Sequence, residues 1–121
     1  MKKDNILHTK SYSFAIRTVK LSQYLNQEKK EYILSKQILR SGTSIGALIR
    51  ESQYAQSHAD FINKLTISLK EANETQYWIN LLFDTDFITK DMHTSLFADI
   101  DEIISLLVSI TKTLKNKSIR P

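Results

Sequence analysis

A chain of 121 residues is long enough to form one domain with a hydrophobic core, and 41% hydrophobic with 25% charged residues is a globular rather than a disordered composition. The absence of cysteine excludes disulfides, thiolate nucleophiles and cysteine-ligated metals. The net charge of +4 is uneven, because residues 1–30 hold seven basic against two acidic side chains and residues 58–88 hold two against five, which can steer an anionic partner or let subunits complement one another.

The sequence shows no recognisable targeting segment. The first residues, MKKDNILHTKSYSF, lack the apolar core of a signal peptide, and no apolar run approaches the roughly 18 residues of a membrane span. We therefore expect a soluble cytoplasmic protein without a membrane partner. Helix breakers are scarce, since the single proline is the last residue and only two glycines occur, which predicts an all-α protein.

Four segments carry apolar residues at the three-and-four spacing of a helix. The first covers residues 11–27, the second 31–56 and the third 59–83. The fourth covers 90–115 with an unbroken heptad seam from Leu96 to Leu114, and Thr89 and Asp91 suit its N-cap and first turn. Short connections between long amphipathic helices predict an antiparallel up-down-up-down four-helix bundle, one domain over 1–121 with flexible tails at 1–9 and 116–121.

The second segment holds both glycines of the chain, Gly42 and Gly46, in the stretch QILRSGTSIGALIRESQYA. Each glycine inside a helix costs about 1 kcal/mol relative to alanine. A helix that carries this cost usually has either a close neighbour or a kink. Small residues beside the glycines, Ser41, Ser44 and Ala47, favour close packing of another helix within the bundle.

The third segment carries a second stripe besides its core face. Ile67, Glu71, Glu74 and Trp78 recur at four-three-four spacing and lie roughly a quarter turn or more from the face of Phe61. In a monomer this stripe would leave an isoleucine and the only tryptophan in water. We predict a subunit interface, because tryptophan is enriched at interfaces; the alternative is a single exposed tryptophan beside a wide core face.

The second segment, residues 31–56, also has a polar stripe beside its core face, and this stripe can face the Glu71 and Glu74 stripe of the third segment. Glu51 could then lie near Glu71 and Glu74, and three close carboxylates repel one another unless cations or hydroxyls satisfy them. We interpret the set as a polar network that fixes helix register or subunit geometry. Its candidate members are Arg40, Ser41, Ser44, Glu51, Ile67, Glu71, Glu74 and Trp78.

Two stretches, LRSGTSIGALIRES and DFINKLTISLKEANETQYWINLL, resemble the family of four-helix bundle proteins encoded in intervening sequences of bacterial 23S ribosomal RNA genes. The family pattern is Arg-Ser-x-x-Ser-Ile-x-x-Asn-x-x-Glu, then Phe-x-x-x-Leu, a Ser/Ala-x-x-Glu-x-x-Glu run and an aromatic residue. The likeness covers roughly residues 10–115, with its specific motifs between 38 and 83. The matching residues are Arg40, Ser41, Ser44, Ile45, Glu51, Phe61, Leu65, Ser68, Glu71, Glu74 and Trp78. Leu48 departs from the pattern, because the family usually has Asn there.

The resemblance implies a four-helix bundle that assembles as a ring-shaped homopentamer. It also implies kinship with the accessory variability protein of diversity-generating retroelements, which works with a reverse transcriptase and nucleic acid. For the intervening-sequence proteins themselves it implies no assigned activity, with nucleic-acid binding as the leading supposition.

Nucleic-acid binding, to RNA or DNA, also has support from the residues. Tyr12, Tyr24 and Tyr32 interleave with the basic residues of the first segment and could stack bases. Repeated around an oligomer, the basic residues would form a phosphate-binding surface with strong salt dependence and little sequence selectivity, since no recognition motif is visible. The alternatives are solubilising charge and ordinary half-buried tyrosines. The candidate residues are Lys10, Arg17, Lys20, Lys29 and Lys30, with Lys2 and Lys3 in the same basic region.

Motifs of enzymes are absent. None of the six glutamates has a histidine three residues later, so the di-iron carboxylate pattern is missing, and His8, His58 and His93 lack metal-ligand spacing. No nucleophile elbow or glycine-rich phosphate loop occurs. We expect no catalysis, metal or cofactor. The alternative function is a structural ring that binds a protein partner, such as a reverse transcriptase, without touching nucleic acid.

Overall fold

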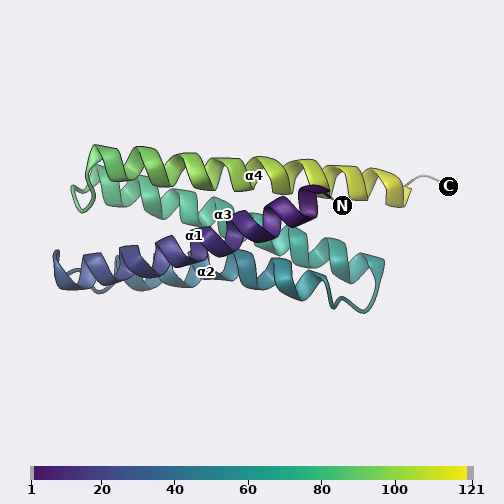
Figure 1. The fold of residues 1–121 in the computed structure, drawn as a ribbon, viewed down its shortest axis with the longest axis horizontal. Helices are drawn as coiled ribbons and strands as arrows, with labels where there is room; N and C mark the ends of the chain where they lie inside the picture. The colour runs from purple at the N-terminus through teal and green to yellow at the C-terminus, as the bar shows by residue number, and fades with distance from the viewer. Residues whose placement is uncertain (1, 120–121) are drawn as a thin grey trace.

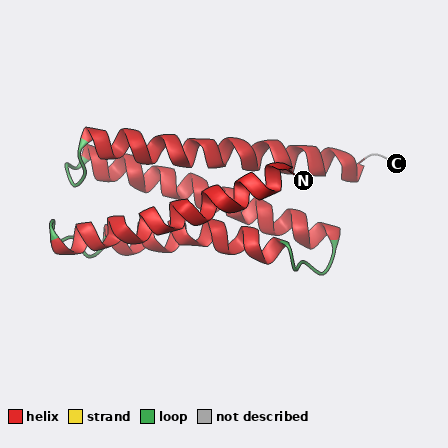
Figure 2. Ribbon diagram, viewed as in Figure 1, coloured by secondary structure: helices red, strands yellow, loops and turns green. Residues whose placement is uncertain are grey.

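The computed structural model describes residues 2–119, and the side chains of residues 6–117. It contains four helices, α1 (Lys2–Gln27), α2 (Leu34–Ser52), α3 (His58–Asp84) and α4 (Lys90–Ile119), and no strand within the described range. Consecutive helices run in opposite directions (Figure 1), and the loops that join them lie at the two ends of the molecule (Figure 2). The predicted all-α four-helix bundle is confirmed.

Each helix packs against its neighbours along the chain, and α1 also contacts α4, which closes the bundle. The heptad seam of α4 is buried as expected, from Leu96 through Ile100, Ile103 and Leu107 to Ile110. The other three helices contribute residues to the same core cluster, so the described chain forms one hydrophobic core. Burial of these side chains is the main stabilising contribution to the fold.

The helix boundaries differ from the expected ones at several ends. Residues 2–9, expected as a tail, belong to α1, because Leu7 is only 1% exposed and extends the core by one more turn. Residues 116–119 continue α4, while residues 1, 120 and 121 of the expected tails lie outside the described part of the chain.

Helix α2 begins at Leu34 rather than at residue 31, because Glu31 caps it from outside. The Glu31 carboxylate accepts hydrogen bonds from the backbone N–H groups of Leu34 and Ser35, at 2.9 and 2.8 Å. Lys30, in the connection after α1, has a φ of 52°, a left-handed conformation that does not continue a helix. Helix α2 ends at Ser52 rather than at residue 56.

The starts of α3 and α4 are also capped by side chains. Thr89 Oγ1 accepts the backbone N–H of Met92 at 3.2 Å, which confirms the predicted N-cap of α4. Ser57 Oγ accepts from the Asp60 N–H at 3.0 Å, and Asp60 accepts in return from the Gln56 N–H. This reciprocal pair fixes the start of α3.

At both glycines α1 packs directly against the backbone of α2. A Cβ added to Gly42 would lie 2.6 Å from Thr18 Cγ2, and one added to Gly46 would lie 3.3 Å from the backbone oxygen of Ser11. Neither distance leaves comfortable room for a side chain. The close packing of a neighbouring helix, predicted from these glycines, is confirmed, and the neighbour is α1.

Candidate functional site

A charged cluster joins α2 to α3 at the edge of their interface. The Arg40 guanidinium approaches Glu71 Oε2 to 3.2 Å through Nη1 and donates to Glu74 Oε2 through Nη2. Trp78 Nε1 donates to the same Glu74 oxygen at 3.0 Å. We call these four residues the Arg40 cluster; all four belong to the predicted polar network.

Glu74 is the shared acceptor of the Arg40 cluster. The hydrogen bond from Trp78 lowers the pKa of Glu74 below its ordinary value of 4.5, and Arg40 lowers it further, while partial desolvation opposes both. The hydrogen bond to Glu74 in turn raises the pKa of Arg40. The folded protein therefore favours the ionised carboxylate at this position.

The prediction that a single bundle would leave Trp78 exposed to water is wrong. Its ring is half-buried and packs against the hydrophobic core, and it meets Tyr77 edge-on with ring centroids 5.0 Å apart. Ile67 is half-buried as well. The indole can occupy this flank because its apolar ring is covered while its one N–H reaches Glu74. A subunit interface over the still exposed parts of the stripe stays a prediction.

The hydroxyl members of the predicted network lie at different depths. Ser41 is buried and accepts a hydrogen bond from Thr75 Oγ1 at 2.9 Å, which ties α2 to α3 beneath the Arg40 cluster. Ser44 donates to the Arg40 carbonyl of its own helix at 2.6 Å. Glu51 is exposed and makes no ion pair with any described residue, so it does not join the cluster.

The candidate phosphate-binding residues fall into two groups. Lys10 Nζ lies 2.9 Å from Glu102 Oε1 and Arg17 Nη1 lies 2.6 Å from Asp99 Oδ2, so both cations already hold α1 to α4. Lys20, Lys29 and Lys30 are exposed and make no ion pair within the described chain. Only this second group offers unpaired charge; the side chains of Lys2 and Lys3 lie outside the described residues.

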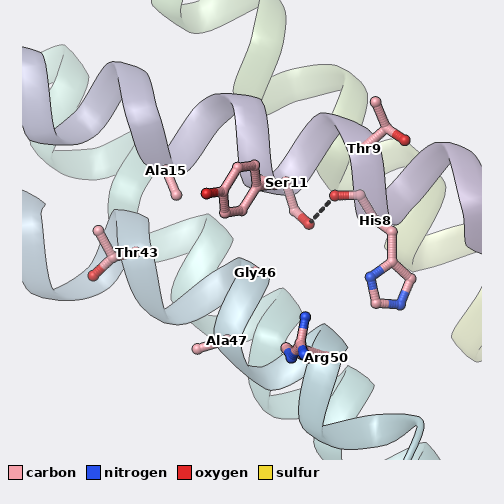
Figure 3. A pocket seen from close by; sticks show the side chains of 9 residues that line it. His8, Thr9, Ser11, Ala15, Thr43, Gly46, Ala47 and Arg50 are labelled. Atoms are coloured by element: carbon pink, nitrogen blue, oxygen red, sulfur yellow. Dashed lines mark hydrogen bonds between the residues drawn. The ribbon is translucent and has the colours of Figure 1, made fainter.

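A groove of about 580 Å³ lies between α1 and α2, and we call it the α1–α2 groove. Its floor is Gly46, where the two helices come together, and Tyr12 lines it while remaining 70% exposed. Figure 3 shows His8 and Arg50 on the same side of Gly46, with Thr43 and Ala15 on the other side. Arg50 is exposed and makes no ion pair with a described residue.

Sequence reasoning singled out Tyr12 as a stacking residue but did not place Arg50 and His8 beside it. A helical wheel of α2 shows that Arg50 follows Gly46 by one turn and shares its side of the helix. The sequence alone does not tell which helix packs on that side of α2, and the structure shows that it is α1. Thr75 was missed for a similar reason, because a single buried hydroxyl looks like any other core position until its partner is known.

Neither a metal site nor a membrane-spanning helix is found among the described residues. No three side chains among their His, Asp and Glu residues converge as a metal site. None of the helices in the same range combines the length and apolar character needed to cross a bilayer.

The fold and its surface define a class of small four-helix bundle proteins, with a basic first helix and a polar α2–α3 edge. A comparison with known families matches residues 3–109 to the 23S rRNA-intervening sequence proteins. The chain belongs to this family, as its two central motifs indicated.

Among solved structures, the chain is similar to a protein of unknown function from the S23 ribosomal protein family of Bacteroides thetaiotaomicron. The two sequences are 58% identical, and the match covers 91% of this chain and 98% of the other, with a TM-score of 0.89. The search of curated proteins produced no match.

Proposed function

We propose that the protein is a non-enzymatic homo-oligomeric module that binds nucleic acid, RNA foremost, through its phosphate backbone. The observation that carries the proposal is the set of exposed, unpaired cations at Lys20, Lys29 and Lys30, on α1 and the α1–α2 connection. The family resemblance, for which nucleic-acid binding is the leading supposition, supports such a partner.

Oligomerisation matters to this function because three lysines on one small bundle give only a weak electrostatic contact. Each neutralised phosphate releases a condensed counterion, so affinity depends steeply on the number of contacts and on salt. We call Lys20, Lys29 and Lys30 the lysine set. A pentamer, the assembly implied by the family resemblance, would present this set five times, and several sets could then contact one nucleic-acid strand together.

The test is binding of nuclease-treated protein to a structured RNA and a matched DNA duplex, titrated across salt. We expect a steep negative slope of log affinity against log salt for the unaltered protein. A variant with Lys20, Lys29 and Lys30 changed to Gln should bind more weakly and with a shallower slope, by up to about 0.9 for each lost duplex contact.

The matched control changes Lys112, Lys115 and Lys117 to Gln, since these exposed residues near the far end of α4 carry the same total charge. This control should keep the slope of the unaltered protein. Equal losses in both variants would mean that net charge, not a surface, governs binding, and no binding at low salt would refute the proposal.

The second candidate function is a structural ring that binds a protein partner, such as a reverse transcriptase. One observation favours it: Tyr12, Ile16 and Val19 are 70%, 44% and 41% exposed and lie at helical spacing on the outer side of α1. Clustered exposed apolar side chains are typical of protein-interaction surfaces. Failure of nucleic-acid binding together with a stable oligomer would favour this function.

A further inference from the structure

The α1–α2 groove combines features that the lysine set lacks. It contains an exposed aromatic ring, Tyr12, an unpaired cation, Arg50, and an imidazole, His8, around a floor that Gly46 keeps free of side-chain atoms. Its volume of about 580 Å³ lies within the range of roughly 300–1,000 Å³ that is usual for small-molecule sites. The groove is therefore large enough to hold more than a lone anion.

We propose that the α1–α2 groove takes one nucleotide unit of a single-stranded nucleic acid, with the base on Tyr12 and the adjoining phosphate on Arg50. This inference rests on the proposed function and makes it specific, because it names the form of nucleic acid and the residues that read it. Neither Tyr12 nor Arg50 belongs to the lysine set, so the two surfaces can be tested separately.

The chemistry of the groove favours this occupant over simpler ones. A free phosphate would use Arg50 but leave the Tyr12 ring in water, whereas base stacking covers an aromatic face and tolerates any base. Arg50 has no carboxylate to displace among the described residues, unlike Lys10 and Arg17, so its charge is available to an anion.

The groove also separates single strands from duplexes. In a duplex the base faces are already stacked on their neighbours and cannot lie on Tyr12 without unpairing. In a single strand the base can rotate outward, and unstacked bases commonly bind aromatic and arginine side chains. Duplex binding by the lysine set should consequently be insensitive to Tyr12.

The experiment measures fluorescence anisotropy of a labelled oligoadenosine RNA decamer and of an RNA duplex of the same length. Three variants act on the groove: Tyr12→Leu removes the aromatic face, Arg50→Gln removes the charge, and Ala47→Phe fills the space from an exposed position. Two controls act elsewhere, on α4: Val108→Ala removes an exposed apolar side chain, and Lys112→Gln removes an exposed charge.

We expect Tyr12→Leu and Ala47→Phe to weaken decamer binding at least about fivefold, the lower end of the loss for one base–aromatic stack. Arg50→Gln should weaken binding and reduce the salt slope by about 0.7, as for one phosphate contact on a single strand. Both controls should stay within about twofold of the unaltered protein. Duplex affinity should not respond to Tyr12→Leu.

Two results would overturn the groove proposal while leaving the proposed function intact. In one, the lysine variant loses binding but the three groove variants behave like their controls. In the other, Tyr12→Leu weakens decamer and duplex equally, so that stacking is not the cause. Absence of binding to either RNA by the unaltered protein would instead overturn both.

A second measurement reports on the groove alone. Adenosine monophosphate is titrated into the isotope-labelled protein, and backbone amide shifts are followed by NMR. Shifts at Thr43, Gly46 and Arg50 that disappear in Ala47→Phe support the assignment. Shifts confined to residues 29–36, at the lysine-bearing connection, would overturn it.

Discussion

At the scale of single residues, the carboxylate of Glu74 connects two helices. It accepts from Trp78 on its own helix and from Arg40 on α2, and the Trp78 hydrogen bond is the larger cause of its lowered pKa. Glu74 is still partly exposed, with 36% of its side chain accessible, so water screens its interaction with Arg40. Its contribution is consequently modest at neutral pH but visible in the pH dependence of stability.

Glu74→Gln should reduce the loss of folding stability that acidification causes. Because the folded pKa lies below the ordinary value of 4.5, the ionised carboxylate stabilises the fold above that pH, and the contribution disappears as pH falls through the folded pKa. Urea unfolding at pH 7 and at several points from about pH 5 to pH 3 measures the effect.

The unaltered protein should lose more stability over this window than the Gln variant. Glu51→Gln is the control, since Glu51 is exposed and unpaired within the described chain, and it should lose as much as the unaltered protein. An identical loss of stability on acidification in all three proteins would show that the ionisation of Glu74 does not stabilise the fold.

At the scale of helices, the packing of α1 on α2 depends on the absence of a side chain at Gly42. Thr18 occupies the space that a Cβ would need, and its hydroxyl donates to the Phe14 carbonyl at 2.8 Å in the interior. A β-branched side chain has few alternative rotamers in a helix. Thr18 therefore cannot move aside easily.

Gly42→Ala should destabilise the protein by about 1–3 kcal/mol, the usual cost of overpacking, despite a helix-propensity gain of about 1 kcal/mol. Thr18→Ala in the same chain should recover much of the loss, which a double-mutant cycle from urea unfolding would measure. Gly46→Ala is the matched comparison and should cost less, because its contact with Ser11 is 3.3 Å rather than 2.6 Å. Additive effects of the Gly42 and Thr18 changes would contradict the assigned contact.

The number of helices and the core face of α4 were predictable from apolar spacing, because periodicity depends on each helix alone. The start of α1 was not, since the sequence of residues 2–9 has no apolar repeat and, among the described side chains of residues 6–9, only Leu7 belongs to the core. The burial of Trp78 was also unpredictable, because a helical wheel gives the direction of a side chain but not the reach of the neighbouring helix. The pairs Arg17–Asp99 and Lys10–Glu102 join positions far apart in sequence, and only the packing of α1 beside α4 brings them together.

At the scale of the whole molecule, the proposed function includes an assembly of several copies of the bundle. The predicted interface stripe on α3 includes Ile67 and Trp78, which are half-buried in the single chain. Tyr77 next to them is 58% exposed. A partner subunit seated here would cover what remains accessible of these residues and of the Arg40 cluster.

Trp78→Ala should shift the assembly toward smaller species while helicity persists. The lost ring is part of both the core edge and the predicted interface, so the variant should also unfold at lower urea concentration. Light scattering after size exclusion gives the mass, and circular dichroism gives the helix content. Phe61→Ala is the control, because it removes a half-buried ring that packs on the core from another part of α3.

If both variants lose the same stability but only Trp78→Ala loses assembly mass, the stripe is an interface. A full assembly mass for Trp78→Ala would refute that role.

The attachment of α1 has a further consequence, for local unfolding. The inward side of α1 includes Ser11, Thr18 and Ser22 among its buried residues, and its bridges to α4 are the exposed pairs of Lys10 and Arg17. Exposed ion pairs stabilise a structure by only about 0–1 kcal/mol, so α1 is held mainly by its buried apolar side chains Leu7, Phe14, Leu21 and Leu25. We expect α1 to open as one unit when this packing is lost, so that its amides exchange together. The α1–α2 groove exists only while α1 is closed. A nucleotide bound there should consequently slow hydrogen exchange along the whole of α1, well beyond the residues that it touches.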